Sequence, residues 1–180
     1  MEIRLSGFGG QGIIRMGLIL GKAASIHDNK NATLTQSFGP EARGGACSAQ
    51  VIISDQAILY PYLTTAELLV AMSQEAYDKF EPELGENGLL LIEEDLVRPH
   101  ETRPGIRQYA VPATRMAEKL GNRMYANLVM LGFLGAISRV VSREALNAAL
   151  PGMVPDRLLA KNQEALNQGF EAGLAKLRGT

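Results

Sequence analysis

The alternation of apolar and polar positions predicts strands and helices in turn along the first two thirds of the chain. Residues 2–6 change between polar and apolar at each position, which is typical of a half-buried strand. A glycine-rich loop at 7–12 separates this strand from an apolar helix that starts at Ile13. The same reasoning predicts strands at 32–36, 47–53, 57–60, 68–72, 88–92 and 109–111, and helices at 13–27 and 73–80.

The last third of the chain is predicted to be helical. Helices are expected at 113–120, 124–138, 142–150 and 156–177, and the last of these carries an apolar stripe along one side. Strands that alternate with helices, followed by helices alone, favour the α/β class. We therefore expect a single Rossmann-like three-layer domain over residues 1–180. It should have a mostly parallel sheet, a right-handed βαβ unit at its start and a helical C-terminal third.

The composition excludes several classes of function. The 180 residues are 46% apolar and 21% charged, with 18 basic and 19 acidic side chains and a net charge of −1. Because there is no basic excess and only 6% of residues are aromatic, neither nucleic acid nor an anionic membrane is expected as a partner. The one cysteine, Cys47, excludes an internal disulfide framework and a four-cysteine cluster held by this chain alone.

The sequence contains no recognisable targeting or membrane-spanning segment. Its first residues lack the basic and long apolar regions of a signal peptide. The apolar stretch 128–141 is interrupted by Ser138 and Arg139, and it is shorter than the ~20 residues that cross a bilayer. We therefore expect a cytoplasmic protein whose thiol is reduced.

The first candidate site is the loop Gly7-Phe-Gly-Gly-Gln-Gly12. Gly7, Gly9, Gly10 and Gly12 allow the backbone to turn tightly and to approach a ligand closely. The helix that follows Gln11 would direct free N–H groups and its positive dipole end toward an anion, such as a phosphate or a carboxylate. The structural alternative is that the glycines only permit close packing between the strand and the helix.

A dinucleotide such as NAD is not favoured at this loop. An NAD site needs an acidic side chain at the end of the second strand, where it holds the ribose hydroxyls. Thr35, Gln36 and Ser37 stand at that place, and the nearest downstream carboxylate is Glu41, which lies beyond Pro40.

The second candidate site is the loop from Ser37 to Gly45, which should lie beside the first glycine loop at the carboxyl end of the sheet. Arg43 could make a forked contact to a phosphate or a carboxylate, and Glu41 could orient it. With Gly44 and Gly45, these residues indicate a ligand loop or an interface. The alternative is a Glu41–Arg43 surface pair of little energetic weight.

The remaining chemistry-bearing side chains are fewer and weaker. Cys47, between two small residues, is expected to be a core thiol rather than a nucleophile. Asn127 interrupts the apolar face of the helix at 124–138, where a buried amide needs partners, so it could cap a loop or meet another subunit. The sequence shows no Ser-His-Asp order, no paired carboxylates and no metal-ligand spacing. We therefore assign no catalytic residue and no metal site.

Several motifs, taken together and in order, are similar to those of a known family. They are Gly7-Phe-Gly-Gly-Gln-Gly12, Ser37-Phe-Gly-Pro-Glu-Ala-Arg-Gly-Gly45, Val51-Ile-Ile-Ser-Asp55, Val111-Pro-Ala113, Gly121-Asn122 and Asn127-Leu-Val-Met-Leu-Gly132. Over residues 3–175 their spacing resembles the gamma subunit of 2-oxoacid:ferredoxin oxidoreductases. The first residues and the stretch 69–75 are most similar to the 2-oxoglutarate branch. Two residues depart from the family pattern, since Phe38 and Glu67 replace the Tyr and Asp that are usual in the family.

The resemblance implies a role in a multi-subunit enzyme. That family oxidatively decarboxylates a 2-oxoacid with coenzyme A, which gives an acyl-CoA, carbon dioxide and reduced ferredoxin. Thiamine diphosphate, Mg and iron–sulfur clusters are then expected in partner subunits, namely alpha and beta and, as a further candidate, a ferredoxin-like delta subunit. This chain alone would hold no cofactor and would meet ferredoxin only indirectly. We infer in addition that its glycine loop, which suits an anion, would help to shape the coenzyme A entrance.

Other functions remain open at this point. The nearest alternative is a subunit of an indolepyruvate or pyruvate:ferredoxin oxidoreductase, which performs the same type of chemistry. A stand-alone nucleotide-binding module and a purely structural subunit belong to different classes. The identity of the chains that co-purify with this one would distinguish these functions.

Overall fold

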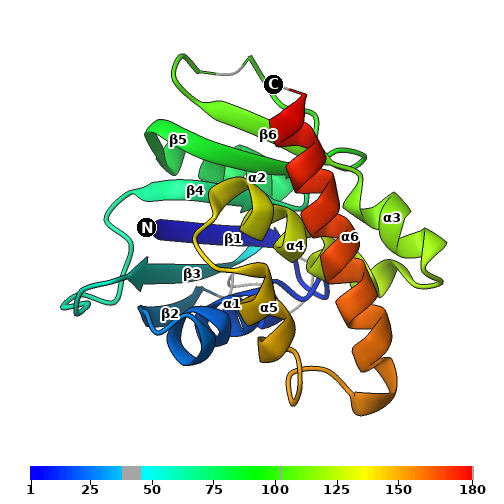
Figure 1. The fold of residues 1–180 in the computed structure, drawn as a ribbon. Coiled ribbons are helices and arrows are strands. Elements are labelled where there is room, and N and C mark those ends of the chain that lie inside the picture. The colour runs from blue at the N-terminus through cyan, green and yellow to red at the C-terminus, as the bar shows by residue number, and fades with distance from the viewer. Residues whose placement is uncertain (38–45, 102, 180) are drawn as a thin grey trace.

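The computed structural model describes residues 1–37, 46–101 and 103–179, and the side chain of Ser37 is not described. A six-stranded sheet in the order β2-β3-β1-β4-β5-β6 forms the middle layer (Figure 1). Its strands are β1 (Glu2–Phe8), β2 (Asn31–Ser37), β3 (Ala46–Ser54), β4 (Ala66–Ala71), β5 (Leu84–Glu93) and β6 (Arg107–Val111). The helices are α1 (Ile13–Lys22), α2 (Gln74–Phe80), α3 (Ala113–Lys119), α4 (Ala126–Ser138), α5 (Arg143–Ala149) and α6 (Leu159–Arg178).

Short helical turns extend or precede several of these helices. A π-helical turn, η1 (Ala23–His27), continues α1, and the 3₁₀ turns are η2 (Glu81–Glu83), η3 (Arg123–Tyr125) and η4 (Asp156–Leu158). In the part of the chain that the structure describes, no helix combines the length and the apolar character needed to cross a bilayer.

The sheet is mostly parallel, as predicted. β1, β4, β5 and β6 run in the same direction, and β3 is antiparallel to both β1 and β2. The expected βαβ unit is modified, because β3 lies between β1 and β2 and separates them. Since β1 and β2 are both antiparallel to β3, they still point the same way and their carboxyl ends share one edge of the sheet.

Alternation along the strands produces two cores, one on each face of the sheet. Leu5, Val70 and Leu91 belong to the larger core, whereas their neighbours Leu69 and Leu90 belong to the smaller one. Helices α1, α3, α4, α5 and α6 contribute side chains to the larger core, and of the described helices α2 covers the other face (Figure 1). The expected three layers are therefore present, but they are unequal.

The helical C-terminal third is held by very close packing between α4 and α6. A Cβ added to Gly132 would lie within 3.0 Å of the carbonyl oxygen of Leu166, and a Cβ added to Gly169 would do the same at Val129. Both glycines are buried. The two helices are thus in backbone contact at this crossing, because only residues without a Cβ fit there.

The predicted strand at 57–60 is wrong. Residues 55–65 contain no strand and connect β3 to β4 as an irregular segment. The apolar residues of this segment resemble a strand pattern. The two strands that the segment connects, β3 and β4, are each already paired on both sides, so neither has a free edge to which it could add. Pro61 also lacks the N–H that a ladder needs.

Candidate functional site

The first glycine loop lies at the carboxyl edge of the sheet and leads directly into α1. Gly10 and Gly12 have φ angles of 94° and 77°, which lie in the left-handed region that favours glycine. Gly12 is the N-cap of α1, and no side chain caps this helix end. No acidic residue stands in the first turn of α1 either, so its free N–H groups are available to an anion.

Gln11 holds the loop in place from the inside. Its side-chain oxygen accepts a hydrogen bond from the Phe8 N–H at 2.7 Å, and its amide nitrogen donates to the Met72 carbonyl at 2.9 Å. The glutamine therefore ties the end of β1 to the end of β4. A Cβ on Gly7 would collide with the Gln11 side chain, which explains the first glycine of the motif.

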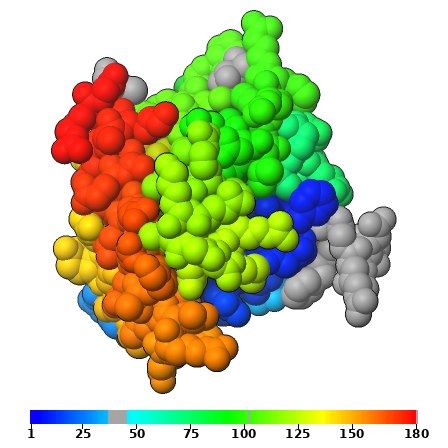
Figure 2. All heavy atoms as spheres, turned by 90° about the vertical axis from the view of Figure 1, so that its right-hand side faces the viewer, coloured from blue at the N-terminus to red at the C-terminus, as the bar shows by residue number. Residues whose placement is uncertain are grey.

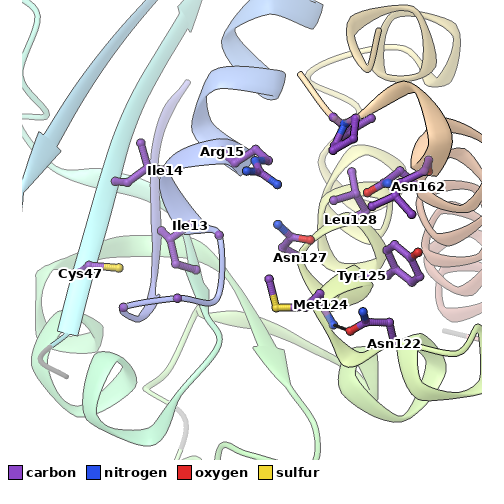
Figure 3. A pocket seen from close by; sticks show the side chains of 16 residues that line it. Ile13, Ile14, Arg15, Cys47, Asn122, Met124, Tyr125, Asn127, Leu128 and Asn162 are labelled. Atoms are coloured by element: carbon purple, nitrogen blue, oxygen red, sulfur yellow. Dashed lines mark hydrogen bonds between the residues drawn. The ribbon is translucent and has the colours of Figure 1, made fainter. Parts of the chain in front are cut away.

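A cavity of about 560 Å³ opens beside this loop, between α1 and the helical C-terminal third (Figure 3). Gly9, Gly10 and Gly12 line one side, and Asn127 and Leu128 of α4 line another. The apolar part of the lining is completed by Ile13, Ile14, Met124, Tyr125, Val154, Pro155 and Leu158, and the polar part by Arg15, Asn122, Asn162 and the Cys47 thiol.

Asn127 is the most unusual polar residue of this cavity. It is 4% exposed, and its side-chain oxygen has no hydrogen-bond partner among the described residues. Its amide nitrogen stands over Gly12, where any Cβ would collide with it. A buried amide oxygen that lacks a partner is costly. The arrangement therefore suits a bound group that donates a hydrogen bond at this position.

The other polar residues of the cavity differ in how far they are already engaged. Asn122 caps η3 through a 2.9 Å bond from the Met124 N–H, and the Asn162 amide donates to the Leu158 carbonyl at 2.7 Å. Arg15 is exposed on the first turns of α1 and points into the space between α1 and α4 (Figure 3). It places a permanent positive charge next to the uncapped helix end.

Cys47 lies on β3 at the edge of the same cavity and is half-buried. Burial raises the pKa of its thiol above the ordinary value. The thiol is therefore protonated at neutral pH, which does not favour a nucleophilic role.

A second, smaller cavity of about 380 Å³ lies on the other side of the glycine loop. Phe8, Leu96 and Met124 line it and are each partly exposed, which gives this side of the loop an apolar rim. Figure 2 shows this end of the molecule, where the blue segment after β1 reaches the surface beside the yellow-green α3.

The predicted site residues are only partly brought together. Gly9, Gly10, Gly12 and Asn127 line one cavity, as described above, whereas Gly7 and Gln11 support the loop from within. Ser37 ends β2 opposite Ser48, which also pairs with Ser6, so the second loop begins at the same edge of the sheet. The remaining residues predicted for the second loop lie outside the described residues; they are Glu41, Arg43, Gly44 and Gly45.

Sequence reasoning missed Arg15, Asn122 and Asn162 as cavity residues. Arg15 comes three positions after Gly12, so helical spacing could have placed it near the loop. Asn122 and Asn162 are far away in the sequence, and only the packing of α4 and α6 brings them to the cavity. Among the described residues, no group of three or more His, Cys, Asp and Glu side chains could hold a metal ion.

The comparisons with known proteins agree with this architecture. The sequence profile described as pyruvate ferredoxin/flavodoxin oxidoreductase matches residues 2–172. The chain is 46% identical, over 94% of its length and 92% of the relative, to the 2-oxoglutarate synthase subunit KorC of Methanocaldococcus jannaschii. It is 41% identical to the keto/oxoacid ferredoxin oxidoreductase gamma subunit of Geobacter sulfurreducens, with a TM-score of 0.84 and coverage of 97% and 98%.

A third similar protein is much longer. The 2-oxoglutarate:ferredoxin oxidoreductase of Magnetococcus marinus, with 2-oxoglutarate, coenzyme A and succinyl-CoA bound, is 25% identical with a TM-score of 0.86. The likeness covers 97% of this chain but 31% of that one. The chain belongs to the pyruvate ferredoxin/flavodoxin oxidoreductase family. Within it, the protein is a gamma-type subunit of a 2-oxoacid:ferredoxin oxidoreductase.

Proposed function

We propose that this gamma subunit serves a 2-oxoglutarate:ferredoxin oxidoreductase and that its glycine-loop cavity contacts coenzyme A. The complex would convert 2-oxoglutarate and coenzyme A to succinyl-CoA and carbon dioxide, with the electrons passing to ferredoxin. The names of the similar KorC subunit and of the Magnetococcus enzyme support the choice of oxoacid. Alpha and beta subunits, and a ferredoxin-like delta subunit where present, would carry thiamine diphosphate, Mg and the iron–sulfur clusters. The complex is expected in the cytoplasm.

The observation that carries the coenzyme A contact is the Asn127 oxygen above the uncapped start of α1, which has no hydrogen-bond partner in the described part of the chain. Coenzyme A carries phosphates, which suit the free N–H groups of that helix end and the guanidinium of Arg15. It also carries amide and amino donors, which could satisfy the Asn127 oxygen. The apolar walls formed by Ile13, Ile14 and Leu128 suit its less polar parts.

The described residues of this chain do not fit the redox groups of the reaction. Cys47 is the one cysteine of the sequence, and an iron–sulfur cluster needs several thiolates. Among the described residues that line the cavity, Arg15 is the one permanently charged side chain, and these residues include no carboxylate or histidine that could act as an acid–base pair. We therefore expect that the isolated chain folds but does not decarboxylate an oxoacid. Turnover by the pure chain with a 2-oxoacid, coenzyme A and an electron acceptor would contradict this.

The coenzyme A contact can be tested in the assembled enzyme with Arg15→Ala and Asn127→Leu. A charge-assisted hydrogen bond contributes about 1.5–3 kcal/mol, so loss of the Arg15 contact should raise the KM for coenzyme A roughly 10-fold or more. The KM for the oxoacid should not change, because the oxoacid reacts on the partner subunits. Arg178→Ala, which removes the same charge at the far end of α6, is the matched control.

The outcomes separate the two parts of the proposal. An unchanged KM for coenzyme A in both variants would remove the cavity from the coenzyme A path. The choice of oxoacid is tested separately, by the initial rate of viologen reduction by the wild-type complex with 2-oxoglutarate, pyruvate or indolepyruvate. A preference for pyruvate or indolepyruvate would favour the corresponding alternative. Purification of the chain without any other subunit would instead favour a stand-alone nucleotide-binding module.

A further inference from the structure

The irregular segment between β3 and β4, which we call the β3–β4 projection (residues 55–65), carries a cluster of three exposed large side chains. Leu59 is 95% exposed, Tyr60 is 63% exposed and Tyr62 is 54% exposed. The two tyrosine rings contact each other, with their centroids 5.5 Å apart. Three large apolar or aromatic side chains gathered on one projection are typical of a binding surface, since isolated ones are common but clusters are not.

Hydrogen bonds hold both ends of the projection. The Glu2 carboxylate accepts from the N–H groups of Thr64 and Thr65, at 2.5 and 3.0 Å. At the other end the Ser54 hydroxyl accepts from the Gln56 N–H at 3.0 Å. A segment that is fixed at its base before binding loses less conformational entropy when it binds.

The projection lies at the opposite end of the sheet from the glycine loop. β3 pairs with β1 in antiparallel register, so residues beyond Ser54 extend past the start of β1, whereas the glycine loop follows its end. Figure 1 shows the projection beyond the chain's amino terminus. Seven residues of β1 at about 3.3 Å each put the two sites roughly 23 Å apart. The projection therefore cannot belong to the proposed coenzyme A contact.

The comparisons indicate what kind of partner binds the projection. In the Magnetococcus enzyme the matching domain is 31% of one longer chain, so peptide bonds attach it to the rest. The KorC subunit of Methanocaldococcus jannaschii, by contrast, is a subunit that this chain matches over 92% of its length. If this chain serves its complex as a separate subunit, as the KorC subunit does, its own surfaces must supply the attachment that the longer chain has covalently.

The charges around the projection define the partner's chemistry further. Glu2 and Asp55 stand at its base, and Glu67 accepts from the Glu2 N–H at 2.6 Å. Among the described residues, Glu2 and Asp55 form no ion pair, and Glu67 pairs with the Met1 ammonium at 3.6 Å. A complementary surface would therefore have an apolar recess edged by basic side chains.

We propose that the β3–β4 projection docks this chain onto a partner subunit of its own complex, in an apolar recess with a basic rim. Leu59, Tyr60 and Tyr62 fill the recess, and Asp55 faces the rim. This inference rests on the proposed function, because it requires that partner subunits exist. It assigns attachment to one end of the sheet and ligand contact to the other.

The test uses the complete complex, co-expressed with the doubly substituted chain Leu59→Ser, Tyr60→Ser. We expect the protein concentration at which half of the chain dissociates to rise roughly 10-fold or more, as for central interface residues. Ile26→Ser is the matched control, since Ile26 is 68% exposed but lies on η1, away from the projection. Asp55→Lys should weaken assembly as well, and most strongly at low salt.

Several readouts can overturn the inference. Unchanged dissociation of the double variant would do so, and so would an equal loss in Ile26→Ser. Sedimentation of the isolated chain tests whether the projection instead binds a second copy of this chain. A wild-type dimer that is absent in the double variant would make the second copy the partner and would overturn the inference. At protein concentrations that keep the double-variant complex intact, its KM for coenzyme A should be normal. A raised KM in Arg15→Ala with normal assembly would support the proposed function independently of this result.

Discussion

The packing of α4 against α6 predicts that the same substitution, glycine to alanine, has opposite effects at two helical positions. In Gly132→Ala the new methyl group would meet the backbone of Leu166, which cannot rotate away as a side chain would. In Gly21→Ala, within α1, nothing lies within 4 Å of the added Cβ and the backbone is helical. The first change should therefore force the helices apart, and the second should only improve helix propensity.

The magnitudes follow from these surroundings. Alanine in place of a helical glycine is worth about 1 kcal/mol at either position. Overpacking costs typically 1–3 kcal/mol, and a clash with backbone belongs at or above the upper end of that range. Gly132→Ala should thus lose about 2 kcal/mol net, and Gly21→Ala should gain about 1 kcal/mol. For a chain of this length about 2–4 °C correspond to each kcal/mol, so Tm should fall by about 4–8 °C in one variant and rise by about 2–4 °C in the other.

The assay is thermal unfolding of the isolated chain, followed by circular dichroism. Gly169→Ala should behave as Gly132→Ala does, because it meets Val129 across the same crossing. A Tm for Gly132→Ala at or above that of the wild type would show that α4 and α6 are not in backbone contact.

Three further outcomes are expected. Glu93→Gln should lower the free energy of unfolding in urea by about 2 kcal/mol, because this fully buried carboxylate accepts hydrogen bonds from the N–H groups of Asp95, Leu96 and Thr114. The control is Glu94→Gln, which removes a partly exposed ion pair with Arg115 and should lose less. Cys47 should react with iodoacetamide more slowly than free cysteine at pH 8, and its rate should keep rising above pH 9, since burial raises its pKa. Gln11→Ala should speed hydrogen exchange in the glycine loop, and an unchanged exchange rate would contradict the tie to Met72.

The strands and helices with strong periodicity could be predicted from the sequence. The alternation at 2–6 and the leucine run at 88–92 correspond to β1 and β5, and the four C-terminal helices are all present. The order of the strands could not be predicted, because no local pattern specifies that β3 runs between β1 and β2. The strand predicted at 57–60 is wrong for a similar reason. A local pattern does not show whether apolar residues such as Leu59 and Tyr60 are buried, and here both are exposed.

The candidate site was predictable only where the backbone itself carries the signal. The glycines after β1 indicate a turn with positive φ, and Gly10 and Gly12 adopt it. Asn127 stood out as a polar residue in an apolar helix, but its position over Gly12 depends on how α4 packs. Arg15 gave no signal of its own, because an exposed arginine on a helix is ordinary until a cavity lies beside it.

The unequal covering of the sheet has a consequence for how the native molecule opens. One face is buried under five helices, whereas the other is covered by the seven residues of α2 and by the segment around Val97. That segment is bonded to α2, because the N–H groups of Arg98 and His100 donate to the side chains of Gln74 and Tyr77. Detaching α2 together with residues 97–101 would uncover Leu69 and Leu90 without removing any residue of the larger core. The lowest-energy sub-global opening should therefore be the joint release of residues 73–83 and 97–101, and limited proteolysis of the native protein should cut in these segments first.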